Sequence, residues 1–129
     1  MRWVLIMAAL FGASSVIIGA SLRHLGAGFD LDVVQTALHY HQLYSLVLLA
    51  MGLYVLDKPF ASHKVLGLSA ALFICATLVF SGSLYALALL NIPALGYFTP
   101  IGGVLFIAAW SSLLFAKCRP QTTRTDDSM

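Results

Sequence analysis

Long apolar runs separated by short polar stretches dominate the chain. Residues 3–22 carry no charged side chain, and an α-helix of that length spans roughly 30 Å, the thickness of a bilayer's hydrocarbon core. A second uncharged run lies between Asp32 and Asp57. The two runs predict membrane-spanning helices over residues 3–22 and 33–56, the second of which starts after a capping box formed by Asp32 and Gln35.

The third apolar run is too long to cross a bilayer once. No charged residue occurs from Val65 to Ala116, whereas a single span needs about 20 residues. The segment Asn91-Ile92-Pro93 divides this run, because proline lacks the backbone N–H that a helix interior requires. We therefore predict two further spans and a polar tail, over residues 65–90, 98–116 and 117–129.

Composition places these helices in lipid. The 129 residues are 60% hydrophobic and 9% charged, and a soluble domain of this size would expose too much of that apolar surface to water. We expect an all-α fold, with one four-helix transmembrane bundle over residues 1–129. A cleaved signal peptide is the alternative for the first run, but that run is longer than the apolar region of such a signal.

The basic residues predict the orientation of the bundle. Six of the seven lie at the amino terminus, in the second loop or in the tail, and only Arg23 lies at the opposite end. By the positive-inside rule, both termini then face the cytoplasm. These topology determinants also explain the net charge of +2, so the expected partner is the lipid bilayer and no nucleic acid is needed.

Small residues recur at helical spacing in the predicted spans. In lipid, helices associate through close backbone approach rather than through burial of apolar surface. We expect Cys75 to act as a small buried hydrophobe in the third span. A homo-oligomer or another membrane protein is a further partner for such faces. The predicted packing positions are Gly12, Ser15, Gly19, Gly67, Gly82, Gly102 and Gly103.

Three histidines lie near the predicted outer ends of the first two spans. His24 follows the first span, and His39 and His41 flank Tyr40 in the second. Such side chains favour the membrane interface, where the ring is apolar and its polar tip meets water. Imidazoles also bind transition metals, but two residues of separation turn His39 and His41 about 200° apart on a helix. Interface anchoring is therefore preferred, and metal binding is the alternative.

Hydroxyl groups gather in the third span and near the start of the fourth. They satisfy their hydrogen bonds by bonding the preceding turn or a neighbouring helix, so structural roles come first. No Asp or Glu lies within a predicted span, and we assign no catalytic residue, metal or cofactor. The candidate outer-side polar pocket consists of His24, Tyr40, His41, Tyr44, Ser81, Ser83, Tyr85 and Thr99.

Four segments of the chain carry a resemblance to a known family. Two lie in the second half, FSGSLYALAL at residues 80–89 and FTPIGGVLFIAAW at residues 98–110. Two lie in the first half, GASLRH at residues 19–24 and VQTALHY at residues 34–40. These segments resemble the YgdD-like small membrane proteins. The resemblance implies a four-span protein of the bacterial inner membrane, with animal relatives and no assigned activity.

The resemblance also bears on the histidines. His24 matches the family pattern, whereas His39 and His41 are features of this chain. Tyr44 stands where the family commonly has a histidine. The resemblance therefore implies no shared mechanism built on the His39-Tyr40-His41 segment.

Three functional hypotheses follow from these patterns. The first is a small membrane protein that acts through helix contacts as a binding or scaffolding component. The second is an oligomeric channel or small transporter, which requires a continuous polar path lined by Ser81, Ser83 and Thr99. The third is a metal- or cofactor-binding membrane protein that uses the outer-side histidines. The small-residue faces and the absence of reactive groups favour the first.

Overall fold

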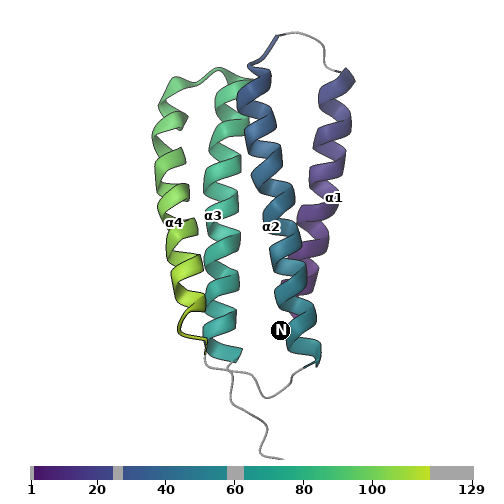
Figure 1. Ribbon diagram of the computed structural model, residues 1–129. Helices are drawn as coiled ribbons and strands as arrows, with labels where there is room; N and C mark the ends of the chain where they lie inside the picture. Colours follow the sequence, from purple (N-terminus) through teal and green to yellow (C-terminus); the bar gives the residue numbers. More distant parts are fainter. Residues whose placement is uncertain (1, 25–27, 58–62, 117–129) are drawn as a thin grey trace, which may run out of the picture.

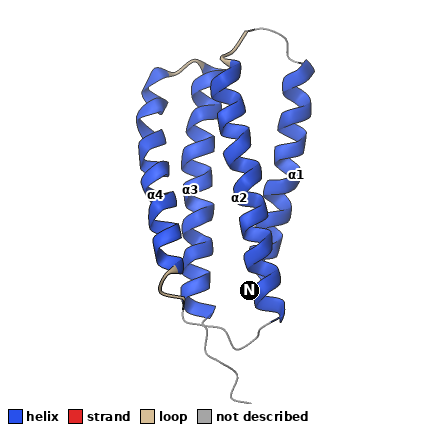
Figure 2. Cartoon of the chain, in the orientation of Figure 1, coloured by secondary structure: helices blue, strands red, loops and turns tan. Residues whose placement is uncertain are grey.

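The fold consists of four long α-helices and one short 3-10 helix (Figure 1). The computed structural model describes residues 2–24, 28–57 and 63–116, and within these ranges no strand occurs (Figure 2). The predicted all-α four-helix fold is confirmed. The elements are α1 (Arg2–His24), α2 (Leu31–Asp57), α3 (His63–Leu90), η1 (Pro93–Phe98) and α4 (Thr99–Leu113).

The long helices run up and down side by side in the order α4, α3, α2, α1 (Figure 1). α2 and α3 form the central pair, while α1 packs mainly on α2 and α4 packs on α3. Among the described residues, the backbones of α1 and α4 do not approach each other closely. The start of α1 and the end of α4 lie at the same end of the bundle (Figure 1). The bundle is therefore a row built on a central pair rather than a closed ring.

The outside of the bundle is apolar. Ile17, Val104 and Ile107 are 66%, 64% and 68% exposed, respectively. Within the described ranges, three helical segments are long and apolar enough to cross a membrane, namely Arg2–His24, Lys64–Leu90 and Pro93–Leu113. α2 is equally long, with 27 residues, but its segment from His39 to Gln42 makes it more polar. Lipid rather than water is the solvent that suits this surface.

The break between α3 and α4 lies at the predicted segment. Asn91 has a φ of 55°, in the left-handed region that asparagine tolerates better than most residues. Pro93 then begins η1. Pro100 lies in the first turn of α4, where a helix has no partner for the N–H that proline lacks.

The start of α2 differs from the prediction. Asp30 Oδ1 accepts hydrogen bonds from the backbone N–H groups of Asp32 at 3.1 Å and Val33 at 3.3 Å, which makes Asp30 the N-cap. Asp32 lies within the first turn, near the positive end of the helix dipole. The predicted capping box of Asp32 and Gln35 is wrong, because the chain enters the helix two residues earlier.

Aromatic rings fill the space between α2, α3 and α4. Tyr44 of α2 stacks on Phe106 of α4, with ring centroids 3.8 Å apart and an interplanar angle of 13°. The indole N–H of Trp110 donates to the Tyr44 hydroxyl at 3.3 Å. Such pairs stabilise a core beyond their buried area. The aromatic cluster consists of Tyr40, Tyr44, Phe73, Phe80, Phe106 and Trp110.

α3 and α4 are held together at close range. A Cβ atom at Gly102 would lie 2.6 Å from the backbone nitrogen of Phe80, so only glycine permits this approach. Two pairs of hydroxyl oxygens also join these helices, at 2.8 Å and 2.6 Å. These pairs are Ser83 with Thr99 and Ser69 with Ser112.

The other predicted packing positions differ in their surroundings. A Cβ atom at Gly19 would lie 3.2 Å from Leu38 Cδ2, whereas Ser15 is buried and Gly67 is partly buried. At three further positions a Cβ atom would meet nothing within 4 Å, so these residues do not mediate close approach of helices within one chain. They are Gly12, Gly82 and Gly103.

Two small residues lie where the sequence did not lead us to expect them. Gly52 of α2, which the prediction missed, faces Leu5 of α1, and a Cβ atom there would lie 2.5 Å from Leu5 Cδ2. Cys75 is exposed on α3, so the expectation that it is buried is wrong. Small side chains at helical spacing do not by themselves reveal which face of a helix is turned inward.

Candidate functional site

His41 lies inside the bundle, where only 8% of its surface is exposed. Its Nε2 is 3.3 Å from Ser14 Oγ of α1, and its Nδ1 is 3.4 Å from the Tyr85 hydroxyl of α3. The Phe11 ring and the imidazole pack in a T-shaped arrangement, with centroids 5.3 Å apart. Three helices thus meet around one histidine. We call Ser14, His41, Tyr85 and Ser81, which lies one turn of α3 before Tyr85, the polar junction.

The polar junction lies inside the bundle, in the half where α2 begins and α3 ends, since Tyr85 is five residues before the end of α3 and His41 is ten residues after the start of α2. Ser14 stands twelve residues after Arg2 and ten before His24, about 18 Å and about 15 Å along α1. His41 contacts Ser14 and therefore lies at the same depth. The expectation that His41 presents its polar tip to water at the membrane boundary is wrong, because the imidazole is buried and its two nitrogens face α1 and α3.

One arrangement of protons satisfies the hydrogen bonds of the imidazole. The Ser14 hydroxyl donates to the Phe11 carbonyl at 3.1 Å, so its oxygen is free to accept a proton from His41 Nε2. A neutral imidazole has one donor and one acceptor, which leaves Nδ1 to accept from the Tyr85 hydroxyl. A directed chain of donors therefore runs from Tyr85 through His41 and Ser14 to a backbone carbonyl.

Ser81 is the unsatisfied member of the polar junction. It is 2% exposed, and its Oγ has no hydrogen-bond partner among the described residues. It precedes Tyr85 by four residues on α3, so both side chains lie on one face. One turn earlier, Thr77 satisfies its hydroxyl in the way that is usual in helices, because this hydroxyl donates to the Phe73 carbonyl at 2.8 Å. A buried hydroxyl without a partner costs about 1–3 kcal/mol, and water or a ligand normally supplies the missing bond.

The structure divides the predicted pocket among several places. It brings His41 and Tyr85 together and puts Ser81 on the same face of α3 as Tyr85. Ser83 and Thr99 instead bond each other between α3 and α4. Tyr40 and Tyr44 belong to the aromatic cluster, and His24 is exposed at the end of α1.

Ser14 is the member of the polar junction that sequence reasoning missed. It is adjacent to Ser15, and neighbouring residues on a helix differ by about 100° in direction. Ser15 Oγ donates to the Gly12 carbonyl at 2.8 Å, whereas Ser14 also reaches His41. The pair of serines was the available signal, but only the rotation of α1 against α2 decides which one enters the junction.

The described residues support neither a polar path nor a metal site in a single chain. Ser83 belongs to the α3–α4 interface, and Tyr85 belongs to the junction with α1 and α2, so the hydroxyl groups do not form one continuous line. No group of three His, Cys, Asp or Glu side chains in the described part of the chain could hold a metal ion. His39 is exposed and contacts Tyr40 edge-on.

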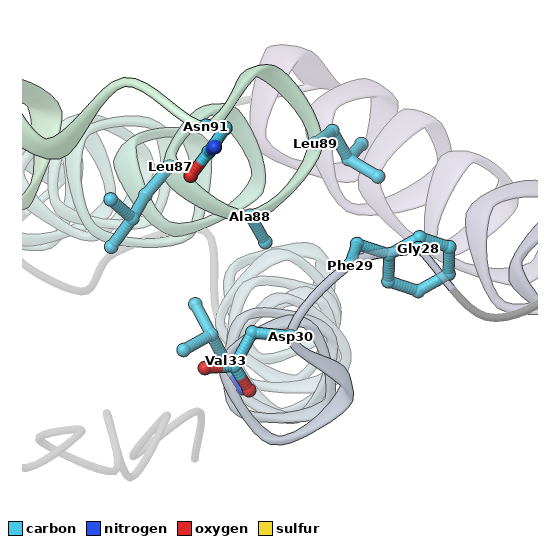
Figure 3. A pocket seen from close by; sticks show the side chains of 8 residues that line it. All are labelled: Gly28, Phe29, Asp30, Val33, Leu87, Ala88, Leu89 and Asn91. Atoms are coloured by element: carbon cyan, nitrogen blue, oxygen red, sulfur yellow. The ribbon is translucent and has the colours of Figure 1, made fainter.

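A hollow of about 600 Å³ lies where α2 begins and α3 ends (Figure 3). Figure 3 shows Ala88 pointing from α3 toward α2, with Asp30 and Val33 on the other side. The carboxylate of Asp30 already accepts two backbone hydrogen bonds as the cap of α2. This carboxylate therefore has a structural role, and we assign no ligand to the hollow.

Four packed helices with an apolar exterior and a buried polar junction define a small α-helical membrane protein. The chain belongs to the family described as "Protein of unknown function (DUF423)", whose model matches residues 5–103. The predicted resemblance to YgdD-like proteins is thereby confirmed.

Named relatives place the chain among membrane proteins. A "UPF0382 membrane protein" of Haemophilus influenzae is 34% identical over 123 residues, covering 92% of this chain and 95% of the relative. The "UPF0382 inner membrane protein YgdD" of Escherichia coli (strain K12) is 32% identical and covers 92% and 91%. The "UPF0382 membrane protein YwdK" of Bacillus subtilis is 32% identical and covers 85% and 94%. No solved structure matches the chain.

Proposed function

We propose that the protein is a binding or scaffolding component of the bacterial inner membrane that holds a small uncharged molecule at the polar junction. It crosses the membrane four times, with both termini in the cytoplasm. The length of α2 and its position between α1 and α3 support the fourth crossing. The excess of basic residues on the side of the termini supports the orientation.

The observation that carries the proposal is the buried, unsatisfied Ser81 hydroxyl, one turn of α3 from the Tyr85 side chain that contacts the buried His41. Polar groups inside a membrane are costly and are commonly retained for function. Both ring nitrogens of His41 are already hydrogen-bonded, one to Ser14 and one to Tyr85. The groups left for a ligand are therefore Ser81 Oγ and the free lone pair of the Tyr85 hydroxyl. No Asp, Glu, Lys or Arg lies near the middle of α1, α2 or α3. An uncharged molecule with a hydroxyl or amide group suits these partners.

The apolar outer faces of α1 and α4 support contacts with other membrane proteins. Each of these helices packs mainly on one neighbour, which leaves much of its surface for lipid or for a partner. Such a role requires no chemistry from the protein, and we assign no reaction to it.

Ser81→Ala tests the proposed ligand. The protein is purified gently with its native lipids, and compounds that co-purify are identified by mass spectrometry. We expect one small polar compound in near-stoichiometric amount with the wild type, and at least about tenfold less with S81A, because a lost hydrogen bond in a buried site costs roughly 1–3 kcal/mol.

Ser83→Ala is the matched control on the same helix, since Ser83 bonds Thr99 and lies outside the polar junction. It should retain the compound at the wild-type level. An identical set of compounds from wild type, S81A and S83A would overturn the proposal. So would a stability gain in S81A without any lost compound, because an empty site gains by removal of its orphaned hydroxyl.

A further inference from the structure

A groove of about 750 Å³ runs between α1 and α2, on the half of the bundle that carries Arg23. On the α1 side it is lined by Ser15 and Gly19, and on the α2 side by Val34 and Leu38. Glycine and serine fill little space beside the branched side chains of α2. The small residues of α1 therefore leave room for the groove, although Leu38 packs closely against Gly19.

The chemistry of the groove changes along its length. Arg23 lines it at the end of α1, and the Gln35 amide lines it from α2. Arg23 and Ser15 are about 12 Å apart along the helix axis, and the lining between them includes Val16 and Leu22. The groove thus has a cationic end and largely apolar walls, with a second amide, that of Gln42, farther along α2.

The exposure of the groove and the depth of Arg23 in the membrane determine which molecules can reach it. Val16 and Leu31 line it and are 67% and 53% exposed, so it opens on the outer surface of the bundle. Arg23 is the penultimate residue of α1, which places it at headgroup depth when α1 spans the bilayer. A guanidinium group binds phosphate through paired, charge-assisted hydrogen bonds.

We infer that this groove binds one glycerophospholipid, with the lipid phosphate on Arg23 and one acyl chain along the apolar walls. A second copy of the chain fits less well, because an apolar helix in the groove would cover the Arg23 charge without pairing it. The site is distinct from the polar junction, since neither His41 nor Ser81 lines the groove. The lipid-binding inference can therefore be tested independently of the proposed small-molecule site.

Native mass spectrometry of the full chain with added phosphatidylglycerol tests the inference. We expect a single tightly bound lipid in the wild type and roughly fivefold to tenfold weaker binding in Arg23→Gln, since one basic side chain near the membrane surface contributes about that factor. Arg2→Gln is the matched control, because Arg2 is exposed at the opposite end of the same helix. It should bind the lipid as the wild type does.

A second pair of variants tests the acyl-chain path. Ala20 lines the groove and is exposed, so Ala20→Trp should fill the groove from outside and abolish the tight adduct. Ala9→Trp adds the same ring at an exposed position of α1 outside the groove and should leave binding unchanged. Equal affinities for R23Q and R2Q, or for A20W and A9W, would overturn the inference.

Alternative occupants give different results in the same experiment. Loss of the phosphatidylglycerol adduct on addition of inorganic phosphate alone would identify a free-anion site and contradict a lipid site. A dimer that persists without lipid and disappears only in A20W would identify a second copy as the occupant. Retention of the lipid adduct in S81A, together with its loss in R23Q, would support the inference whatever the fate of the small polar compound.

Discussion

The imidazole of His41 has its proton position set by its neighbours. The Ser14 hydroxyl donates its hydrogen bond to the Phe11 carbonyl, and the Ser14 oxygen therefore favours a proton on Nε2 of His41. The Tyr85 hydroxyl then completes the arrangement at Nδ1. Each link depends on the one before it, so removal of one hydroxyl affects the whole chain of hydrogen bonds.

Tyr85→Phe should destabilise the protein by about 1 kcal/mol, because it leaves a buried ring nitrogen without a donor while it keeps the aromatic ring. The free energy of unfolding, measured by circular dichroism in an SDS titration from mixed micelles, reports this loss. In the wild type, ¹⁵N chemical shifts of the imidazole should show the proton on Nε2.

Tyr97→Phe is the matched control, since Tyr97 is 82% exposed. It removes the same hydroxyl group and should leave the free energy of unfolding unchanged. Equal effects of the two substitutions, or a wild-type imidazole protonated on Nδ1, would contradict the hydrogen-bond chain described here.

The sequence allowed only part of the polar junction to be predicted. His41, Tyr85 and Ser81 were recognised as polar groups in apolar helices, which is a property of composition. The partnership with Ser14 and the burial of the imidazole were not predictable in this way. Both depend on how far α2 slides and turns against α1, and apolar periodicity leaves that offset open.

At the scale of elements, α3 and α4 form the tightest pair of the bundle. Gly102 lets the α4 backbone approach Phe80, and two hydroxyl pairs lie on either side of that point along the helices. Hydroxyl groups between helices are a common source of association in lipid. The pair should therefore be sensitive to any added volume at the crossing point.

Gly102→Ala should destabilise the protein by roughly 1–3 kcal/mol, because the new methyl group would overlap with the α3 backbone and force the helices apart. Gly103→Ala is the matched control. A Cβ atom at Gly103 meets nothing within 4 Å, and alanine favours a helix over glycine by about 1 kcal/mol. SDS titrations of the two variants should shift in opposite directions, and a shift of G102A toward greater stability would contradict the close approach.

The helices themselves could be predicted from the sequence because charged residues are so rare in this chain. Gaps between charged residues mark the apolar runs, and the Asn91-Ile92-Pro93 segment marks the break. The cap of α2 was assigned to the wrong aspartate, since Asp30 and Asp32 are both plausible caps from spacing alone. Only the path of the backbone distinguishes them.

At the scale of the whole molecule, the up-and-down row places the start of α1 and the end of α4 at one end of the bundle (Figure 1). Arg23, His24, Asp30 and Asp32 are exposed at the other end. The proposed orientation puts the first end in the cytoplasm, because basic residues are held on that side during insertion.

Cysteine labelling in spheroplasts tests the orientation. In a Cys75→Ala background, the native Cys118 of the tail should react with a membrane-impermeant maleimide only after lysis. In a cysteine-free background, Gly28→Cys, an exposed position between α1 and α2, should react in intact spheroplasts. Labelling of Cys118 before lysis would show that the tail lies outside and would reverse the assigned topology.

The row also has a consequence for biosynthesis, because the order of the helices in space is their order in the chain. Each helix that enters the bilayer finds its principal neighbour already there, beginning with the α1–α2 hairpin and ending when α4 joins α3. No helix must wait for a distant segment of the chain before it packs, and such local pairing closes short loops first. This order of contacts thus permits assembly one helix at a time as the chain leaves the ribosome.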